Sequence, residues 1–266
     1  MSTDNLSTDK ITVAAEVLND LQQRVNRTRW SYQIAGTGWD SGTDVEYLMD
    51  LVSYWQHGYD WRTQERALNQ FAHFKTNVDD IGIHFIYERG KGPNPFPLIL
   101  THGYPDSFIR FTKIIPMLTD PENFGGCAEG AFDVVVLDLP GYGFCDRPAK
   151  HGTSFHVNDL WAHLMTDTRG YMRFGAHGGD WGGTVTEQLA RSHAGSVVAI
   201  HLTDVPFGHI FTKPTILQSP RKPQSLAPGL NDSPGGLVAW IVEKLRGWSD
   251  CNGEIETGLT KGEVLT

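Results

Sequence analysis

The sequence predicts an α/β fold with a doubly wound, mostly parallel sheet. Three observations support this prediction. Short apolar runs alternate with longer runs of helical spacing. Such alternation is typical of parallel strands joined by crossover helices. The glycine-rich motifs follow predicted strands, at the end of the sheet where the functional sites of such folds lie. We expect strands at 97–101, 132–137, 171–176 and 197–202, and helices at 107–118, 156–168 and 184–193.

Further elements lie on either side of this core. Amphipathic spacing predicts two early helices, at 12–27 and 44–57. Two strands, at 73–78 and 82–88, and a polar turn at 88–94 are expected to follow. A stretch rich in Pro, Ser and Lys, residues 209–230, indicates the exit from the core. We therefore expect three segments: an N-terminal meander with the first strands at 1–95, the core at 96–208, and a final helical segment at 209–266.

The most informative motif is His-Gly-Gly-Asp-Trp-Gly-Gly at 177–183, between a predicted strand and a predicted helix. A strand, a sharp glycine-lined turn and a helix form a nucleophile elbow, and small residues at Gly178 and Gly182 allow the turn to close. The central residue is Asp180, where such turns usually hold serine. A carboxylate attacks an alkyl carbon, so an ester to the protein forms and must then be hydrolysed.

A simpler interpretation of Asp180 is that it only caps the following helix. Asp before a helix accepts backbone N–H bonds and suits the positive end of the helix dipole. Capping alone needs no flanking glycines, whereas Gly179 and Gly182 here shape the turn around the carboxylate. The nucleophile interpretation is therefore favoured.

A second motif follows the strand predicted at 97–101 and reads Thr-His-Gly-Tyr-Pro-Asp-Ser. In elbow proteins, one oxyanion-hole N–H comes from the residue after the nucleophile and the other from the loop after this earlier strand. Those donors would be Trp181 and Tyr104, with His102, Gly103 and Pro105 shaping the loop. A cis bond before Pro105 would fix the loop, although a plain turn is the alternative.

With these motifs the chain resembles the microsomal-type epoxide hydrolases of the α/β-hydrolase superfamily. The resemblance rests on HGYPDSF at 102–108, DLPGYGFCDRP at 138–148 and GAHGGDWGG at 175–183. The Trp- and Tyr-rich part before the core is similar to that family's N-terminal meander, and residues 222–244 resemble part of its cap domain. The resemblance implies hydrolysis of an epoxide to a vicinal diol without a cofactor.

The resemblance also implies residues that this chain does not match. Members use a His base oriented by an acid, and two cap Tyr hydroxyls that protonate the epoxide oxygen. The eleven histidines end at His209 and the eight tyrosines end at Tyr171. We therefore expect a core truncated on its C-terminal side with a remnant helical cap, and impaired turnover, because a positioned acid or base contributes about 100- to 10,000-fold.

Three other residues have more ordinary interpretations. Asp204 follows the strand predicted at 197–202, where some relatives place an orienting acid, although a turn or cap role is favoured. His177 lies on the strand side of the elbow, so a structural role is expected. Asp138 is expected to fasten the glycine-rich turn that follows it rather than to take part in chemistry.

Composition excludes several classes of protein. The net charge is −9, and no Lys/Arg cluster marks a nucleic-acid surface. Three cysteines without CxxC spacing indicate neither disulfides nor a metal site, and fit a cytoplasmic location. The N-terminus has no signal-peptide pattern, and no apolar run approaches the ~18 residues of a membrane span.

Three functions remain open at this stage. The first is an epoxide hydrolase acting on small apolar epoxides, and the second is a haloalkane dehalogenase, which also uses an Asp nucleophile but usually carries an Asn or second Trp where Tyr104 stands. The third is an inactive binding protein. Truncation would also leave the strand at 197–202 as an open sheet edge, so homo-oligomers or aggregates are expected.

Overall fold

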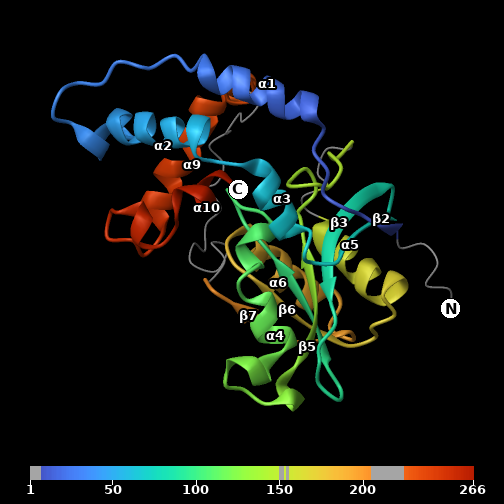
Figure 1. Ribbon diagram of the computed structural model, residues 1–266. Coiled ribbons are helices and arrows are strands. Elements are labelled where there is room, and N and C mark those ends of the chain that lie inside the picture. Colours follow the sequence, from blue (N-terminus) through green and yellow to red (C-terminus); the bar gives the residue numbers. More distant parts are fainter. Residues whose placement is uncertain (1–6, 150–152, 154–155, 205–224) are drawn as a thin grey trace, which may run out of the picture. The chain divides into compact units, whose positions relative to one another are not determined.

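The computed structural model describes residues 7–149, 153, 156–204 and 225–266. Seven strands of the described residues form one sheet in the order β1-β2-β3-β5-β4-β6-β7 (Figure 1). Their bounds are Ser7–Thr8 (β1), His73–Val78 (β2), Ile81–Glu88 (β3), Phe96–Thr101 (β4), Phe132–Leu137 (β5), Phe174–Gly178 (β6) and Val197–Leu202 (β7). The pairs β5–β4, β4–β6 and β6–β7 are parallel, and β1, β2 and β3 add antiparallel pairs on one side. The predicted fold class is confirmed.

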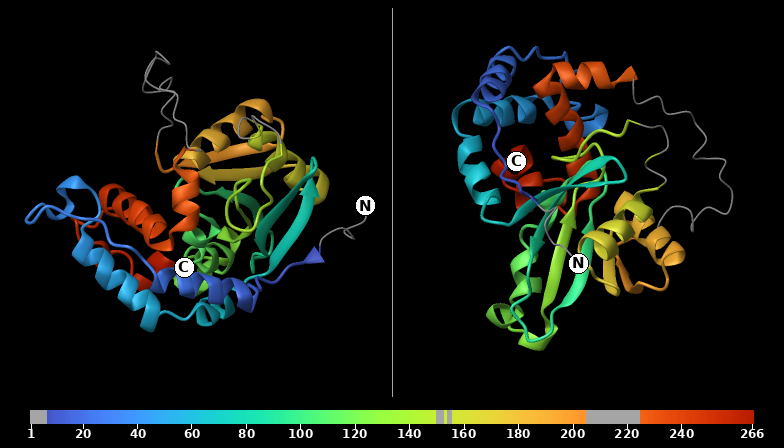
Figure 2. Two further views of the ribbon diagram at one scale, coloured as in Figure 1. Left: turned by 90° about the horizontal axis from the view of Figure 1, so that it is seen from above. Right: turned by 90° about the vertical axis from the view of Figure 1, so that its right-hand side faces the viewer.

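Helices cover both faces of this sheet. Figure 2 (right) shows α4, Ile115–Thr119, on one face, and α5, Val157–His163, with α6, Trp181–Ser192, on the other. The core between the sheet and α5 and α6 includes fully buried side chains from both layers, Trp161 and Phe174 among them. Short turns complete the unit: η2 Phe108–Phe111, η3 Pro121–Phe124, η4 Ala128–Gly130 and the π-helical η6 Leu164–Thr168.

Several predicted elements differ from the observed ones: the helix predicted at 184–193 begins at Trp181, and the helix predicted at 156–168 is divided into α5 and η6. The helix predicted at 107–118 is divided into η2 and α4, because Pro116 has no N–H to continue a helix through this segment. The strand predicted at 171–176 begins only at Phe174, since Gly170 turns the chain at φ 76° and Tyr171 donates its N–H to Met165. Pairing with β4 then carries the strand on to Gly178.

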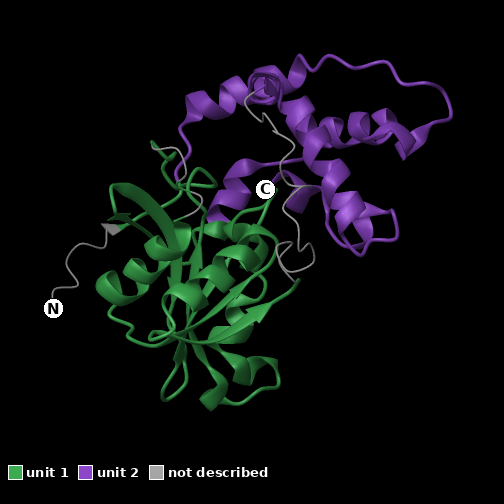
Figure 3. Cartoon of the chain, turned by 180° about the vertical axis from the view of Figure 1, so that it is seen from behind, with its two compact units in different colours: residues 1–11, 67–214 green, residues 12–66, 215–266 purple. Residues whose placement is uncertain are grey.

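The chain divides into two compact units (Figure 3). The sheet unit contains residues 1–11 and 67–214, and the helical unit contains residues 12–66 and 215–266. The three segments predicted from the sequence stay a prediction about chain organisation.

The helical unit packs early helices against late ones. Its described elements are α1 Ala15–Asn26, η1 Gly38–Ser41, α2 Val45–His57, α3 Trp61–Leu68 (which continues into the sheet unit), α8 Ala227–Asp232, α9 Pro234–Trp248, η9 Ile255–Thr257 and α10 Lys261–Leu265. Val25, Leu51 and Val242 are buried in one cluster that joins α1, α2 and α9. None of the described helices has both the length and the apolar content that crossing a bilayer requires.

Strand β7 is the last strand in the described sheet order. It pairs with β6, and most of its side chains are exposed, including Val198 and Ile200. The described part of the sheet therefore ends in an apolar strand, as the sequence predicts.

Candidate active site

The predicted site residues lie at one edge of the sheet. Strands β5, β4, β6 and β7 are neighbours and run parallel, so the loops that follow them meet at the carboxyl edge. The register places Thr101, the last residue of β4, beside Leu137 of β5 and beside Gly178 of β6, which also end their strands. The loop after β4, with Tyr104, and the loop after β6, with Asp180 and Trp181, therefore start side by side.

The turn between β6 and α6 is a strained elbow. Asp180 has φ 55° and ψ −124°, and a positive φ is rare for a non-glycine residue. Two glycines allow the close approach: a Cβ on Gly178 would lie 2.1 Å from the Gly182 carbonyl oxygen, and one on Gly182 would lie 2.1 Å from that of Thr101. The structure thus contains the tight, glycine-lined turn that the sequence predicts.

The Asp180 side chain contacts the loop after β4. Its Oδ1 accepts a 2.8 Å hydrogen bond from the backbone N–H of Tyr104. Gly103 leaves room for this contact, because a Cβ there would lie 2.5 Å from the Asp180 Cβ. The side chain makes no capping bond to α6, so the interpretation of Asp180 as only a helix cap is wrong. Asp180 is exposed, and within the described residues its Oδ2 is left open to a reacting carbon.

Tyr104 and Trp181 occupy the positions predicted for the oxyanion hole. The Tyr104–Pro105 peptide bond is cis, the isomer considered in the sequence analysis. Trp181 is the first residue of α6, and N–H groups of a first helical turn have no partner within the helix. The Tyr104 N–H thus contacts Asp180 Oδ1, and Trp181 follows Asp180 directly in the chain.

Asp204 contacts the backbone of the elbow. Its Oδ1 accepts a 2.7 Å hydrogen bond from the N–H of Asp180. Glycine is needed where the residues after β7 approach the elbow, because a Cβ on Gly179 would lie 2.1 Å from the Thr203 hydroxyl oxygen. In the structure Asp204 therefore orients the backbone of Asp180, while the less favoured role, that of an orienting acid for a histidine, stays a prediction.

His102 is a buried histidine with both ring nitrogens engaged. Its Nδ1 lies 2.8 Å from the Gly103 carbonyl oxygen, and its Nε2 accepts a 3.0 Å bond from the N–H of Leu139. A backbone N–H can only donate, so the ring proton is on Nδ1. Burial lowers the pKa of His102, which favours this neutral ring. His102 therefore shapes the loop and is no general base.

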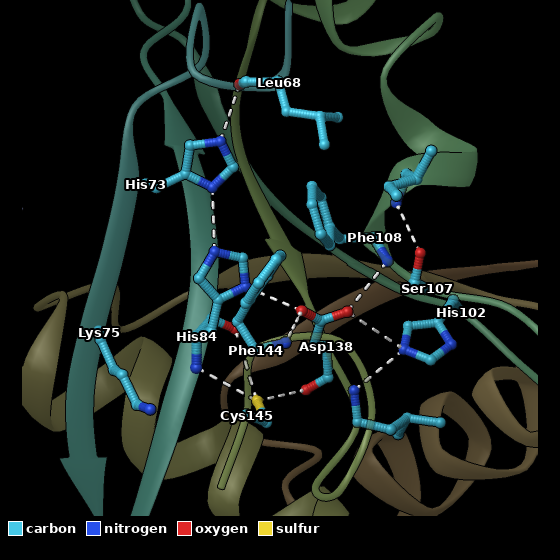
Figure 4. Close-up of polar contacts among 12 residues, drawn as sticks. Leu68, His73, Lys75, His84, His102, Ser107, Phe108, Asp138, Phe144 and Cys145 are labelled. Atoms are coloured by element: carbon cyan, nitrogen blue, oxygen red, sulfur yellow. Dashed lines mark hydrogen bonds and ion pairs between the residues drawn. The ribbon is translucent and has the colours of Figure 1, made fainter. Parts of the chain in front are cut away.

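Asp138 fastens the turn that follows β5, as predicted. Its Oδ2 accepts a 3.2 Å bond from the N–H of Phe144, and its Oδ1 accepts a 3.1 Å bond from the N–H of Phe108 (Figure 4). A Cβ on Gly143, which has φ 48°, would lie 2.2 Å from Oδ2. Asp138 thus ties the loop after β5 to the loop after β4.

His177 pairs with a neighbouring strand. Its Nδ1 lies 2.8 Å from Nδ1 of His201 on β7, and its ring lies edge-on to Phe111. Burial, and then the nearby His201, lower the pKa of His177. These contacts fit the structural role expected for His177. Among the described residues no group of three or more His, Cys, Asp or Glu side chains is arranged to hold a metal ion.

The sequence analysis missed several residues around the site. Asp106 Oδ2 lies 2.7 Å from Arg110 Nε. Burial raises the pKa of the Asp106 carboxyl, and the positive charge of Arg110 offsets part of this increase. The i, i+4 spacing of this pair was a usable signal. Tyr142 packs its ring 5.3 Å from His102, and burial, followed by nearby Tyr104 and Asp180, raises the pKa of its hydroxyl.

Two more missed residues, His73 and His84, lie on the neighbouring strands β2 and β3. They connect to Asp138 through hydrogen bonds (Figure 4). Both side chains are buried. No local sequence pattern announces them, because the contact depends on strand pairing and on a residue more than 50 positions away.

Two family models match the chain. A model described as the N terminus of epoxide hydrolases matches residues 6–111, and a model described as the alpha/beta hydrolase fold matches residues 97–222. Together they cover the early helices and the sheet with its elbow.

Similar proteins align with nearly the whole chain. A putative epoxide hydrolase from Stigmatella aurantiaca is 39% identical over 96% of this chain and 63% of its own length. Epoxide hydrolase 1 of Oryctolagus cuniculus is 31% identical over 97% of this chain and 67% of its own length. The chain therefore spans less than two thirds of the first relative and about two thirds of the second.

Solved structures share the architecture. The crystal structure of juvenile hormone epoxide hydrolase from the silkworm Bombyx mori superposes with a TM-score of 0.84 at 27% identity, over 98% of this chain and 70% of that chain. The epoxide hydrolase of Aspergillus niger has a TM-score of 0.79 over 97% of this chain and 72% of that chain, and its 22% identity supports the fold alone.

Proposed function

The chain belongs to the epoxide hydrolase family of the α/β-hydrolase fold, and from this premise we propose that Asp180 opens an epoxide by attacking one of its carbons. The observation that carries the proposal is the 2.8 Å contact between Asp180 Oδ1 and the N–H of Tyr104. This contact holds one carboxylate oxygen and leaves the other oxygen free to react. The strained elbow presents the side chain at the exposed carboxyl edge of the sheet.

The first chemical step forms an ester. Asp180 Oδ2 bonds to an epoxide carbon, and the bond from that carbon to the ring oxygen breaks. Its electron pair stays on the ring oxygen, which takes up a proton from water. Oδ1 becomes the carbonyl oxygen of the ester and is already placed on an amide donor. Such alignment of a nucleophile before reaction contributes to rate because the orientation is set in advance.

The second step returns the carboxylate. Water adds to the ester carbonyl carbon, and negative charge develops on the former Oδ1. The amides of Tyr104 and Trp181 are the proposed donors to this oxyanion. Collapse of the intermediate breaks the bond between the carbonyl carbon and the alkyl oxygen, and a vicinal diol leaves. No metal or cofactor enters either step.

For this 266-residue polypeptide we propose that the first step outpaces the second. Within these 266 residues no tyrosine follows Tyr171 and no histidine follows His209, so the acids and the base that the resemblance implies have no counterpart among them. A positioned base contributes about 100- to 10,000-fold, so a slow second step leaves the ester on Asp180. The same absence of a general acid slows the first step.

The proposed substrate is a small apolar epoxide. The exposed side chains of Tyr104 and Trp181 adjoin the nucleophile and offer aromatic surface rather than charge. Aromatic rings contribute most through apolar contact. A charged substrate would find no described cation in contact with Asp180.

Intact-mass spectrometry tests the proposal directly. The purified chain is incubated with styrene oxide, and we expect a mass increase equal to one epoxide, mapped by peptide digestion to Asp180. The control is Asp180→Asn, which keeps the size of the side chain and should remain unmodified.

Three outcomes separate the candidate functions. An adduct on Asp180, with or without slow diol release, supports the epoxide hydrolase proposal. Chloride release from a haloalkane without reaction on styrene oxide would instead indicate a dehalogenase. A folded chain that forms no adduct with either reagent would leave only a binding role, and the proposal would be wrong.

A further part of the proposal concerns self-association. Strand β7 ends the described sheet order with exposed Val198 and Ile200, and open apolar strands pair with other chains. We expect size-exclusion chromatography to show dimers or larger species, and a monomer stable to heating would contradict this expectation. A cytoplasmic location stays a prediction.

A further inference from the structure

A buried chain of hydrogen bonds runs from the end of α3 to the loops of the site (Figure 4). His73 Nε2 lies 2.8 Å from the Leu68 carbonyl oxygen, and His73 Nδ1 lies 2.9 Å from His84 Nε2. His84 Nδ1 lies 2.8 Å from Asp138 Oδ2. The side chains of His84 and Asp138 are 1% and 0% exposed, so this contact is shielded from bulk solvent.

The first two contacts determine where the histidine protons lie. A carbonyl oxygen can only accept, so His73 carries a proton on Nε2. One further proton lies between the two rings. Burial is the main cause that lowers the pKa of His73, which favours a neutral ring with a bare Nδ1. His84 therefore donates its Nε2 proton to His73.

The third contact holds one more proton, which is either on His84 or on Asp138. Asp138 also accepts the backbone N–H of Phe108 at Oδ1 and that of Phe144 at Oδ2. Hydrogen bonds donated to a carboxylate favour its ionised form. With Asp138 ionised, His84 carries protons on both nitrogens and is an imidazolium, and the three side chains together have no net charge.

Among the described residues, no cation other than His84 contacts Asp138. His102 Nε2 lies 3.7 Å from Oδ1, but it already accepts the N–H of Leu139 and is unprotonated. The Cys145 thiol donates to the Asp138 carbonyl oxygen. The more distant charges of Asp138 and Asp9 raise the pKa of His73. Asp106 raises the pKa of His102, and Arg110 lowers it.

The rings that enclose the pair are apolar. Phe108 and Phe144 lie edge-on to His84, with ring centroids 5.2 Å and 5.4 Å away. An ion pair in such a place is strongly coupled, because removal of one partner leaves a buried charge without compensation. The charge of His84 and the charge of Asp138 therefore depend on each other.

Asp138 links the charge of His84 to the loop 102–108, whose Tyr104 contacts the proposed nucleophile. Phe108, whose N–H it accepts, ends the segment that begins at His102 and includes Tyr104. The start of that segment is held by His102, through the N–H of Leu139. Tyr104 lies between these two anchors and donates its N–H to Asp180.

We propose that His84 is a positioning residue: as an imidazolium held between His73 and Asp138, it keeps Asp138 as the carboxylate that orients the loop 102–108 and thereby the Tyr104 amide on Asp180. The proposal rests on the proposed role of Asp180 as the nucleophile. It adds a group that touches neither the substrate nor the reacting atoms and acts through the oxyanion loop.

Two substitutions separate charge from shape. His84→Asn places an amide N–H near the position of Nδ1, so a donor to Asp138 remains but the positive charge is lost. His73→Asn places a carbonyl oxygen near the position of Nδ1, so the acceptor for His84 remains. The matched control is His163→Gln, which removes a histidine–aspartate contact of 2.9 Å on the surface, with Asp79.

The reaction readout is the rate of ester formation on Asp180 with styrene oxide. We expect His84→Asn to be about 10- to 100-fold slower, because a displaced Tyr104 amide no longer aligns the Asp180 carboxylate for attack. His73→Asn and His163→Gln should react at nearly the wild-type rate. An unchanged rate in His84→Asn would overturn the proposal even though the function of Asp180 would stand.

Two further readouts do not depend on chemistry. Nitrogen-15 NMR of the histidine rings in the wild-type chain, assigned through the backbone, should show protons on both nitrogens of His84 and on Nε2 alone of His73. Hydrogen exchange of the Tyr104 amide should be at least about tenfold faster in His84→Asn, since local opening exposes it.

These readouts keep the two proposals distinguishable. If the wild-type chain forms no ester, the function fails while the NMR and exchange results still decide the role of His84. If His84→Asn does not fold, the wild-type NMR spectrum decides alone. A singly protonated His84 beside a protonated Asp138 would overturn the proposal.

Discussion

Asp138 and Asp180 follow β5 and β6, the two parallel strands on either side of β4. Both accept backbone N–H groups, yet the two regions differ in which carboxylate oxygens they leave open. Asp138 is fully buried and accepts from Phe108, Phe144 and His84. Asp180 is exposed, has a strained backbone and accepts from Tyr104 through one oxygen. The same residue type thus serves as an anchor in one region and as the candidate nucleophile in the other.

The difference concerns which carboxylate at this edge of the sheet is available to react. A carboxylate whose oxygens are all engaged cannot approach an electrophilic carbon without losing hydrogen bonds that its burial makes costly. A carboxylate with one free oxygen can react while the other is held. Saturation of the oxygens, rather than residue type or strand position, separates the two roles.

The largest expected effect comes from Asp180→Asn, which removes the nucleophile and leaves the anchor. We expect the rate of ester formation to fall by at least about 1,000-fold, because removing a nucleophile leaves only binding and oxyanion contacts. Asn tolerates a positive φ, so the stability should change little. Intact-mass kinetics and urea unfolding measure the two effects, and an undiminished rate would place the nucleophile elsewhere.

Asp138→Asn should show the opposite balance. We expect the free energy of unfolding to fall by about 3–5 kcal/mol, since one member of a buried ion pair is removed. His163→Gln, on the surface, is the control and should cost at most about 1 kcal/mol. Urea unfolding checks both variants. If the two variants lost equal stability, the contrast between a saturated anchor and an open carboxylate would fail.

Gly182→Ala tests whether the elbow depends on close backbone contact. Its Cβ would lie 2.1 Å from the Thr101 carbonyl oxygen, which is backbone and cannot move aside easily. We expect a loss of about 1–3 kcal/mol by overpacking, together with slower ester formation. Gly195→Ala, where nothing lies within 4 Å, is the matched control. Thermal unfolding measures the stability of both variants, and an equal loss of stability in the two would contradict the prediction.

The smallest expected effect concerns the pH dependence of the anchor region. Burial lowers the folded-state pKa of His102, so below the ordinary value of about 6.5 the unfolded state binds more protons. Its contribution to stability is full above that pH and is lost as the pH falls towards the lowered folded pKa. His102→Gln keeps an acceptor for the N–H of Leu139. As the pH falls, we expect this variant to lose less of its free energy of unfolding than the wild type loses.

Urea unfolding at several values between about pH 7 and pH 5 measures this difference in slope. Parallel loss of stability in both proteins would show that His102 is not the group that titrates. The lowered pKa of His73 acts in the same direction, so a residual slope is expected in the variant.

Much of the site could be predicted because its constraints are local. Gly178 and Gly182 mark a turn whose sterics exclude other residues, and Asp180 between them is the candidate nucleophile. Where the prediction was wrong, a local signal was misjudged or overridden. Pro116 interrupts a helix that the apolar spacing favours. The turn at Gly170 delays the start of β6 to Phe174, and pairing with β4 extends the strand to Gly178.

The histidine network could not be predicted in the same way. His73 and His84 become neighbours only when β2 and β3 pair, and Asp138 joins them only when β5 lies beside β3. Each residue alone is an ordinary polar side chain in an apolar strand or turn. Its role depends on partners brought from 11 and 54 residues away.

The sequence by itself determined the α/β class, the elbow with Asp180 and the loop that carries Tyr104, because strand alternation and steric turns act over a few residues. The tertiary structure alone decided which carboxylate is saturated and which keeps a free oxygen. That distinction depends on the donors that distant strands and loops bring to each oxygen, and on how much water their packing excludes.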